Sequence, residues 1–315
     1  MKSLYEALEE YLSLRRGLGF KLKKDGKILA KFIRFLEEQG ACSITTELSV
    51  QWAVKPVNAQ PGQWARRLGA VRLFAEYLSA TDPQTEIPPK KLLTDHYRRR
   101  QPYIYTDEQI VGLIEAAGGL PSTVSSATGL RGRTYYTLLG LLAVTGMRIS
   151  EALALNREDV DVQELMLTIR GTKLGKSRLV PVHPSTGNVL VQYSTMRDRI
   201  YPRPKTRGFF INERGTRLTY GEVQRTFVQL SREIGLRGPC DRRGPRMHDL
   251  RHRFAVQTLI GWYREGLDVG RHILELSTFL GHVKVSDTYW YLSAVPELLH
   301  LAADRLENRN GGKLP

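Results

Sequence analysis

The first eighty residues carry apolar side chains at the spacing of amphipathic α-helices. Apolar positions within residues 4–12 and 28–36 recur every three or four residues, which places them on one face of a helix. We expect a short third helix toward Trp52 and a fourth over about 64–78. No strand pattern interrupts them. Residues 1–82 are therefore predicted to form a small helical domain.

Residues 83–105 break this pattern with prolines and clustered basic side chains. Proline disrupts a helix interior because it lacks the backbone N–H and clashes with the preceding turn. We predict an extended, basic linker here, followed by a second domain over residues 106–315. A basic linker between basic domains fits a clamp around DNA, and equally an ordinary solvated connection. The prolines concerned are Pro83, Pro88, Pro89 and Pro102.

The second domain has the pattern of a mainly helical α+β fold. It opens with a capping box at 106–109 before an apolar helix. Residues 165–169 and 177–182 are predicted as two short strands joined by a glycine-containing turn, with 209–211 as a third strand. The sequence therefore predicts a small antiparallel sheet among helices. Further helices are expected over about 134–144, 219–234, 248–262, 272–280, 286–292 and 296–308.

Length and charge narrow the class of protein. The 315 residues suit two domains, and 47 Lys and Arg against 32 Asp and Glu give a net charge of +15. Such a surplus favours a polyanionic partner, of which nucleic acid is the usual one. The two cysteines, Cys42 and Cys240, support neither a disulfide framework nor a thiolate metal cluster. No apolar run approaches ~20 residues, and the N-terminus is unlike a signal peptide, so we expect a cytoplasmic protein without membrane contact.

Two motifs place an arginine or lysines where an anion could bind. Arg148 follows Thr145-Gly146, where one helix ends and another begins, and Glu151 lies three residues further on. The predicted hairpin turn carries Lys173 and Lys176. Taken alone, an arginine at a helix start or lysines at a turn are most often solvated surface charges. These motifs acquire meaning only together with the following ones.

Three later motifs contain histidines, an arginine and tyrosines. His248 and Arg251, in the motif Met247-His-Asp-Leu-Arg-His252, are three residues apart and share one helix face. Packing explains such a pair poorly, whereas a guanidinium and an imidazole suit a phosphate. His282 follows Gly281 directly, and Tyr291 comes nine residues later in Tyr289-Trp-Tyr-Leu292. Aromatic clusters near a C-terminus are more often core than catalytic.

The order, spacing and flanking residues of these five motifs resemble the tyrosine recombinase (phage integrase) family over about residues 106–300. The helical module before Pro83 is similar in size and shape to the core-binding domain of that family. The stretch from Tyr289 to Leu292, followed by Val295-Pro-Glu-Leu, further resembles integrase-like members carried by mobile elements. The resemblance implies a site-specific recombinase that breaks and rejoins DNA strands for integration, excision or resolution.

The resemblance also implies a role for each motif residue. Tyr291, chosen by its spacing from His282, attacks the phosphorus and forms a 3′-phosphotyrosyl link. Arg148 and Arg251 hold the non-bridging oxygens, and His248 and His282 assist hydrogen bonding and proton movement. Tyr289 is expected to pack into the fold. Counting back from Arg178-Leu-Val-Pro181 makes Lys173 the general acid, with Lys176 as the competing candidate, although Leu174 replaces a residue that is often small.

The resemblance also implies partners for this chain, and the motifs in the sequence predict no cofactor. The family works as a tetramer on two DNA sites, either of identical chains or with a second related recombinase, through a Holliday junction. The amphipathic tail from Pro296 to about Leu306 is expected to dock on a neighbouring subunit. No nucleotide-binding loop or carboxylate cluster is visible, so we predict no metal and no cofactor. Further DNA contacts are expected from Arg66, Arg67, Arg72, Lys90, Lys91, Arg98, Arg99, Arg100, Lys176, Arg178, Arg243 and Arg246.

Three alternatives stay open at this point. A DNA-relaxing enzyme of the type IB topoisomerase kind or a telomere resolvase would share the same chemistry. A DNA-binding regulator could keep the motifs without using them, although all six expected residues are present. A metal-dependent nuclease could use the histidines, and its cleavage would be sensitive to EDTA.

Overall fold

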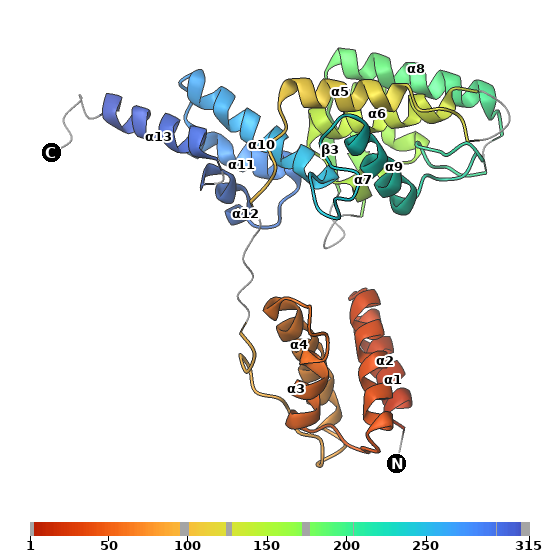
Figure 1. The fold of residues 1–315 in the computed structure, drawn as a ribbon, viewed down its shortest axis with the longest axis vertical. Helices are drawn as coiled ribbons and strands as arrows, with labels where there is room; N and C mark the ends of the chain where they lie inside the picture. The colour runs from red at the N-terminus through yellow and green to blue at the C-terminus, as the bar shows by residue number, and fades with distance from the viewer. Residues whose placement is uncertain are drawn as a thin grey trace. The chain divides into compact units, whose positions relative to one another are not determined.

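The computed structural model describes residues 3–94, 101–123, 128–171, 177–203, 205–293 and 295–309. It divides into two compact units, residues 1–100 and 101–315 (Figure 1). Each unit has a hydrophobic core of its own. Within the described residues, no helix is both long and apolar enough to cross a membrane.

The N-terminal unit is a bundle of four helices around an aromatic core. Phe32, Trp52 and Phe74 belong to this core and are at most 3% exposed. The core-binding domain was expected over 1–82, yet the chain beyond Pro83 stays on this bundle: the Glu86 carboxylate accepts a hydrogen bond from the backbone N–H of Thr46. The helices are α1 (Leu4–Gly17), α2 (Lys23–Glu38), α3 (Thr46–Val54) and α4 (Pro61–Leu78).

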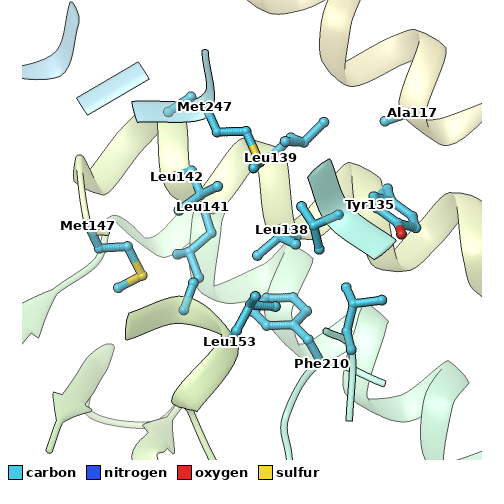
Figure 2. Close-up of a cluster of buried hydrophobic side chains, with 14 of the residues drawn as sticks. Ala117, Tyr135, Leu138, Leu139, Leu141, Leu142, Met147, Leu153, Phe210 and Met247 are labelled. Atoms are coloured by element: carbon cyan, nitrogen blue, oxygen red, sulfur yellow. The ribbon is translucent and has the colours of Figure 1, made fainter. Parts of the chain in front are cut away.

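The second unit is centred on the long apolar helix α6 (Leu130–Thr145), which is buried along most of its length. Leu138, Leu139 and Leu142 of this helix point into the cluster drawn in Figure 2, together with Phe210 and Met247. Helices around it bury their apolar faces against this cluster, which supplies the driving force for the fold. These helices are α5 (Asp107–Gly118), α7 (Ile149–Ala154), α8 (Pro184–Ile200) and α9 (Tyr220–Glu233).

The small antiparallel sheet is confirmed, but its third strand is not the expected one. Strands β2 (Met166–Ile169) and β3 (Arg178–Pro181) pair as predicted, and β1 (Val160–Asp161), after the 3₁₀ turn η1 (Arg157–Asp159), completes the order β1-β2-β3. The prediction of a strand at 209–211 was wrong. All three of its side chains are at most 2% exposed, and the segment fills the core while it makes one isolated bridge, between Ile211 and Arg217.

The C-terminal part of this unit is a helical layer with its own core. It comprises α10 (Met247–Arg264), α11 (Val269–Leu280), α12 (Ser286–Tyr289), the 3₁₀ turn η3 (Trp290–Ser293) and α13 (Pro296–Arg309). Figure 1 shows α13 extending along α10. Leu298 of α13 is 1% exposed and packs in the same cluster as Leu259 and Tyr291. This helix therefore packs on its own unit through Leu298, and docking of the tail on a neighbouring subunit stays a prediction.

Candidate active site

Helix ends position the predicted catalytic residues. Arg148 is the N-cap residue of α7, directly after the glycine that ends α6. His248 and Arg251 lie in the first turns of α10, and His282 follows the Gly281 that ends α11. Tyr291 lies in η3. Helix ends leave backbone N–H and C=O groups without partners inside the helix, so polar side chains and ligands can bind there.

Arg251 is buried, although arginine is rarely so. It is 2% exposed and donates from Nη1 to the Gly146 carbonyl at 2.9 Å and from Nη2 to the Leu280 carbonyl at 2.8 Å. Loss of hydration, together with the charge of Arg148, lowers the pKa of Arg251 to about 10, so it stays charged at neutral pH. A buried cation that tolerates this cost is suited to binding an anion.

Gly146 is needed for this arrangement on two grounds. Its φ is +59°, a conformation that other residues adopt at a cost, and a Cβ built on it would lie 2.6 Å from the ring of Phe254. Its carbonyl orients Arg251, so the Thr-Gly-Met-Arg motif serves both arginines. The local sequence thus fixes a backbone turn that carries one arginine and holds another.

Arg148 remains accessible while being held from two sides. Its Nη1 donates to Oε1 of Glu151 at 2.8 Å, and both Nη1 and Nη2 lie 3.3 Å from the Gly281 carbonyl. About a third of the side chain, 36%, is exposed. Because Arg251 holds the preceding carbonyl, Leu280, the two guanidinium groups gather at the C-terminal end of α11.

His248 lies at the surface beside these cations. Its ring is exposed and makes an edge-to-face contact with the His252 ring, with centroids 4.7 Å apart. Loss of hydration, followed by repulsion from Arg251 and Arg246, lowers the pKa of His248 from 6.5 to about 4. The imidazole is therefore neutral at physiological pH and offers a hydrogen bond rather than a charge.

His282 and Tyr291 form a second pair. The two rings are nearly parallel, with centroids 6.2 Å apart. Nδ1 of His282 is hydrogen bonded to Oγ1 of the fully buried Thr288 at 2.7 Å, which fixes the orientation of the ring. Thr288 comes from α12, so this short helix ties His282 to the segment that carries the tyrosine.

Tyr291 is 1% exposed, and its hydroxyl lies 3.2 Å from Nδ1 of His252. The expectation that Tyr289 packs into the fold was wrong: Tyr289 is 50% exposed, and Tyr291 is the buried member of the pair. The apolar positions of α10 and α13 close over Tyr291, and this tertiary packing decides which ring turns inward.

Two further residues join the site without having been assigned a role from the sequence. His252 contacts Tyr291, Trp290 and His248. His252 is four residues beyond His248, a spacing that places both histidines on one helix face. Its position beside the predicted site could therefore have been inferred from the sequence. Glu151 binds Arg148 and Arg178 together, which no local pattern reveals because Arg178 comes from strand β3.

The residues expected to contact DNA are placed differently from one another. Arg178 is only 11% exposed and forms a buried ion pair with Glu151. Arg246 is paired with Asp249 and is 43% exposed, and Arg243 is exposed. Arg67 stacks on Trp52 at 3.7 Å. Lys173, Lys176 and the arginines at 98–100 lie outside the described residues.

On the N-terminal unit, basic side chains line two grooves beside α4. One contains Lys27 and Lys31 of α2 with Arg66 and Arg67. The other, on a different part of α4, contains Arg72 with Lys90 and Lys91. Two of the arginines that were expected to contact DNA form ion pairs within this unit: Arg66 with Asp25, and Arg72 with Glu76.

These observations together define a class of protein. They are the five motifs, the helical fold with a three-stranded sheet, and the gathering of two arginines, histidines and a tyrosine. Residues 106–297 match the model of the phage integrase family, and the chain belongs to this family of tyrosine recombinases, enzymes that cleave and rejoin DNA strands. The predicted family and fold are thereby confirmed.

Individual relatives agree with this assignment. The chain is 48% identical over 310 residues to "Putative integrase/recombinase y4rB" of Sinorhizobium fredii, covering 98% of both chains. Its fold is similar to the Tn1549 transposon integrase in complex with transposon right end DNA, with a TM-score of 0.67, 15% identity and 98% and 99% of the two chains covered. It is also similar to a lambda integrase tetramer bound to a Holliday junction, with a TM-score of 0.59, 16% identity and 90% and 78% covered.

Proposed function

We propose that this recombinase cleaves DNA with Tyr291 and holds the scissile phosphate with Arg148 and Arg251. One observation carries the proposal. Two arginines from different elements bind the consecutive carbonyls of Leu280 and Gly281, directly before His282, whose ring stacks on that of the buried Tyr291. A phosphodiester needs charge neutralisation on two non-bridging oxygens, and two guanidinium groups supply it.

The reaction exchanges one ester for another. The Tyr291 oxygen attacks phosphorus, a P–O bond to the tyrosine forms, and the bond to the 5′-oxygen breaks. The 3′-phosphotyrosyl product keeps the energy of the original bond, so a 5′-hydroxyl of a partner strand can reverse the step without ATP. The negative charge that builds on the phosphate is stabilised by cations that are already oriented, which avoids reorganisation during the reaction.

His252 and His248 form hydrogen bonds to different reacting groups. His252 Nδ1, when unprotonated, accepts the proton of the Tyr291 hydroxyl as its oxygen attacks. Neutral His248 donates to a non-bridging oxygen from the exposed side of its ring. His282 packs on the tyrosine ring and is oriented by Thr288. Because Tyr291 is 1% exposed, the η3 turn has to move outward when DNA binds.

The leaving 5′-oxygen requires a proton, for which Lys173 is our candidate. Arg178-Leu-Val-Pro181 forms β3, so Lys173 and Lys176 come shortly before, in the sequence, a strand that contacts α11. We expect Lys173→Ala to slow cleavage far more than Lys176→Ala. A substrate with a 5′-bridging sulfur, whose leaving group needs no proton, should restore much of the lost rate. Absence of rescue would assign the acid to another residue.

The substrate is proposed to be double-stranded DNA bound by a tetramer of this chain. The basic groove of Lys27, Lys31 and Arg66 supports a role of the N-terminal unit in DNA binding. The similarity in fold to a lambda integrase tetramer on a Holliday junction supports the assembly. Since cellular DNA is the substrate, we place the activity in the cytoplasm, and a mobile element is the proposed origin of the target site.

The experiment that tests the proposal traps the intermediate. A nicked suicide substrate containing the target site, found by footprinting on DNA that flanks the gene, should yield a covalent adduct in the presence of EDTA. Peptide mapping should place the nucleotide on Tyr291. An adduct on another residue, or cleavage abolished by EDTA, would contradict the proposal. Joining of two sites, rather than relaxation of supercoils alone, would distinguish recombination from topoisomerase action.

A further inference from the structure

Three arginines from three different elements bind three consecutive carbonyls at the end of α11. Arg178 of β3 donates from Nε to Phe279 at 3.0 Å, Arg251 of α10 donates to Leu280, and Arg148 donates to Gly281. The last carbonyls of a helix lack partners inside the helix and carry partial negative charge, so they attract cations. Only two of these arginines were expected to hold the phosphate.

Arg178 and Arg148 also share one carboxylate. Oε1 of Glu151 accepts from Nη1 of Arg148 at 2.8 Å and from Nη1 of Arg178 at 3.1 Å. Oε2 accepts from Nη2 of Arg178 at 2.7 Å and from the backbone N–H of Arg148 at 2.9 Å. Burial alone would raise the pKa of Glu151, but these hydrogen bonds outweigh it and lower that pKa to about 2. The carboxylate is therefore ionised.

The charges around Glu151 determine what Arg148 can do. A single carboxylate opposite Arg148 would cancel most of the positive charge that a phosphate requires. The fork of Arg178 meets both oxygens of Glu151 and supplies a second positive charge, so the three groups together keep a net charge of +1. Arg178 is 11% exposed and Glu151 is 8% exposed, so solvent screens this pairing poorly.

We propose that Arg178 is a positioning residue that neutralises Glu151 and anchors the end of α11, and that it does not contact DNA. This inference rests on the proposed function, because it assumes that Arg148 binds the scissile phosphate. Arg178 was expected to contact DNA; we instead assign it to holding the two arginines that are proposed to bind the phosphate.

Gly281 leaves the space that the Arg178 guanidinium group occupies. Its φ is +68°, and a Cβ built on it would lie 2.5 Å from Nη1 of Arg178. A side chain at this position would force the guanidinium group of Arg178, which is bound to Glu151, to shift. The glycine before His282 is thus required by the backbone conformation and by the close approach of Arg178 together.

The test is a double-variant cycle with Arg178→Met and Glu151→Gln. Single-turnover cleavage of the suicide substrate and DNA affinity against salt concentration are measured for each variant. We expect Arg178→Met to slow cleavage by about 10- to 100-fold with unchanged affinity and salt dependence, since a truncated partner leaves the buried Glu151 charge opposed by Arg148 alone. Adding Glu151→Gln should recover at least about tenfold of that rate, because the unbalanced charge is removed.

Two further variants keep the result interpretable. Arg178→Lys retains the positive charge but not the two parallel N–H donors of the guanidinium group, and it should cleave faster than Arg178→Met. Thermal melting checks that each variant is folded. Arg157→Met removes an arginine that pairs with Asp198 away from α11 and should cleave normally. A lower affinity with a salt slope reduced by about one phosphate contact, or no rescue by Glu151→Gln, would overturn the inference. Failure of the proposed function itself would appear separately, as a wild-type adduct on a residue other than Tyr291.

Discussion

The hydroxyl of Tyr291 lies 3.2 Å from Nδ1 of His252, one helical turn beyond His248 on α10. This contact links the proposed nucleophile to the helix that carries Arg251. His252 is 5% exposed, and its ring contacts those of His248, Trp290 and Tyr291. In the free chain this nitrogen lies within hydrogen-bond distance of the phenol oxygen, which is why we assign His252 a part in activating the tyrosine.

We expect His252→Phe to slow adduct formation by about 100-fold or more, the usual size of a lost general base, with DNA affinity within about twofold of wild type. Phenylalanine keeps the ring and most of its packing while removing Nδ1. Single-turnover kinetics on the suicide substrate measure the effect. His272→Phe is the matched control, because His272 belongs to α11 and pairs with the exposed Glu275. Equal rates for His252→Phe and wild type would exclude His252 from the chemistry.

Tyr291→Phe should bind its site normally and form no covalent adduct, since it loses only the attacking oxygen. Tyr289→Phe should cleave at nearly the wild-type rate and melt at nearly the wild-type temperature, because its ring is 50% exposed. Denaturing gel electrophoresis of the protein–DNA adduct distinguishes the two variants. An adduct that persists in Tyr291→Phe would show that another residue attacks.

The pH dependence of stability should depend on His248. Its pKa is lowered to about 4 in the folded chain, so the unfolded chain binds the proton more readily between pH 6.5 and 4. His248 therefore contributes stability above pH 6.5 that is lost as the pH falls toward 4. Wild type should lose more stability than His248→Gln between pH 7 and pH 4.5 in urea titrations. The difference is expected to be modest, because the ring is exposed.

A DNA phosphate beside His248 should act in the opposite direction. An anion favours the protonated imidazole and raises its pKa. The NMR titration midpoint of His248 should therefore lie near pH 4 in the free chain and move upward when target DNA is added. An unchanged midpoint on binding would place the phosphate away from this ring.

Leu298→Ala should destabilise the second unit by about 2–5 kcal/mol, the usual cost of removing a buried leucine side chain. Leu298 is 1% exposed in the core shared with Tyr291. Leu299→Ala is the matched control: Leu299 is 53% exposed, and its truncation should change stability by no more than about 0.5 kcal/mol. Thermal unfolding measures both. If both changes were small, α13 would not be part of this core in solution.

Lys27→Gln combined with Lys31→Gln should reduce the salt dependence of DNA binding. Both lysines lie on α2 and line one groove with Arg66. If each contacts one phosphate, the slope of log K against log salt should fall by about 1.8, or 0.9 for each contact. Fluorescence anisotropy over a salt series gives this slope. A parallel line with the wild-type slope would place the DNA elsewhere on the N-terminal unit.

The sequence alone determined the features that depend on local pattern. Helical spacing predicted the four N-terminal helices, and glycines and capping residues marked the helix ends at Gly146 and Gly281, because such signals act within a few residues. The proposed catalytic residues could be picked out for the same reason: His248 and Arg251 share a helix turn, and His282 directly follows a helix-ending glycine. These motifs keep their order along the chain whatever the packing.

Only the tertiary structure decided how those residues are used. It turned Tyr291 inward and Tyr289 outward, placed Arg178 on Glu151, and packed α13 on its own unit. It also used residues 209–211 as core rather than as a strand. Each of these outcomes depends on contacts between segments far apart in the chain, where burial of apolar area and the pairing of buried charges outweigh local preference.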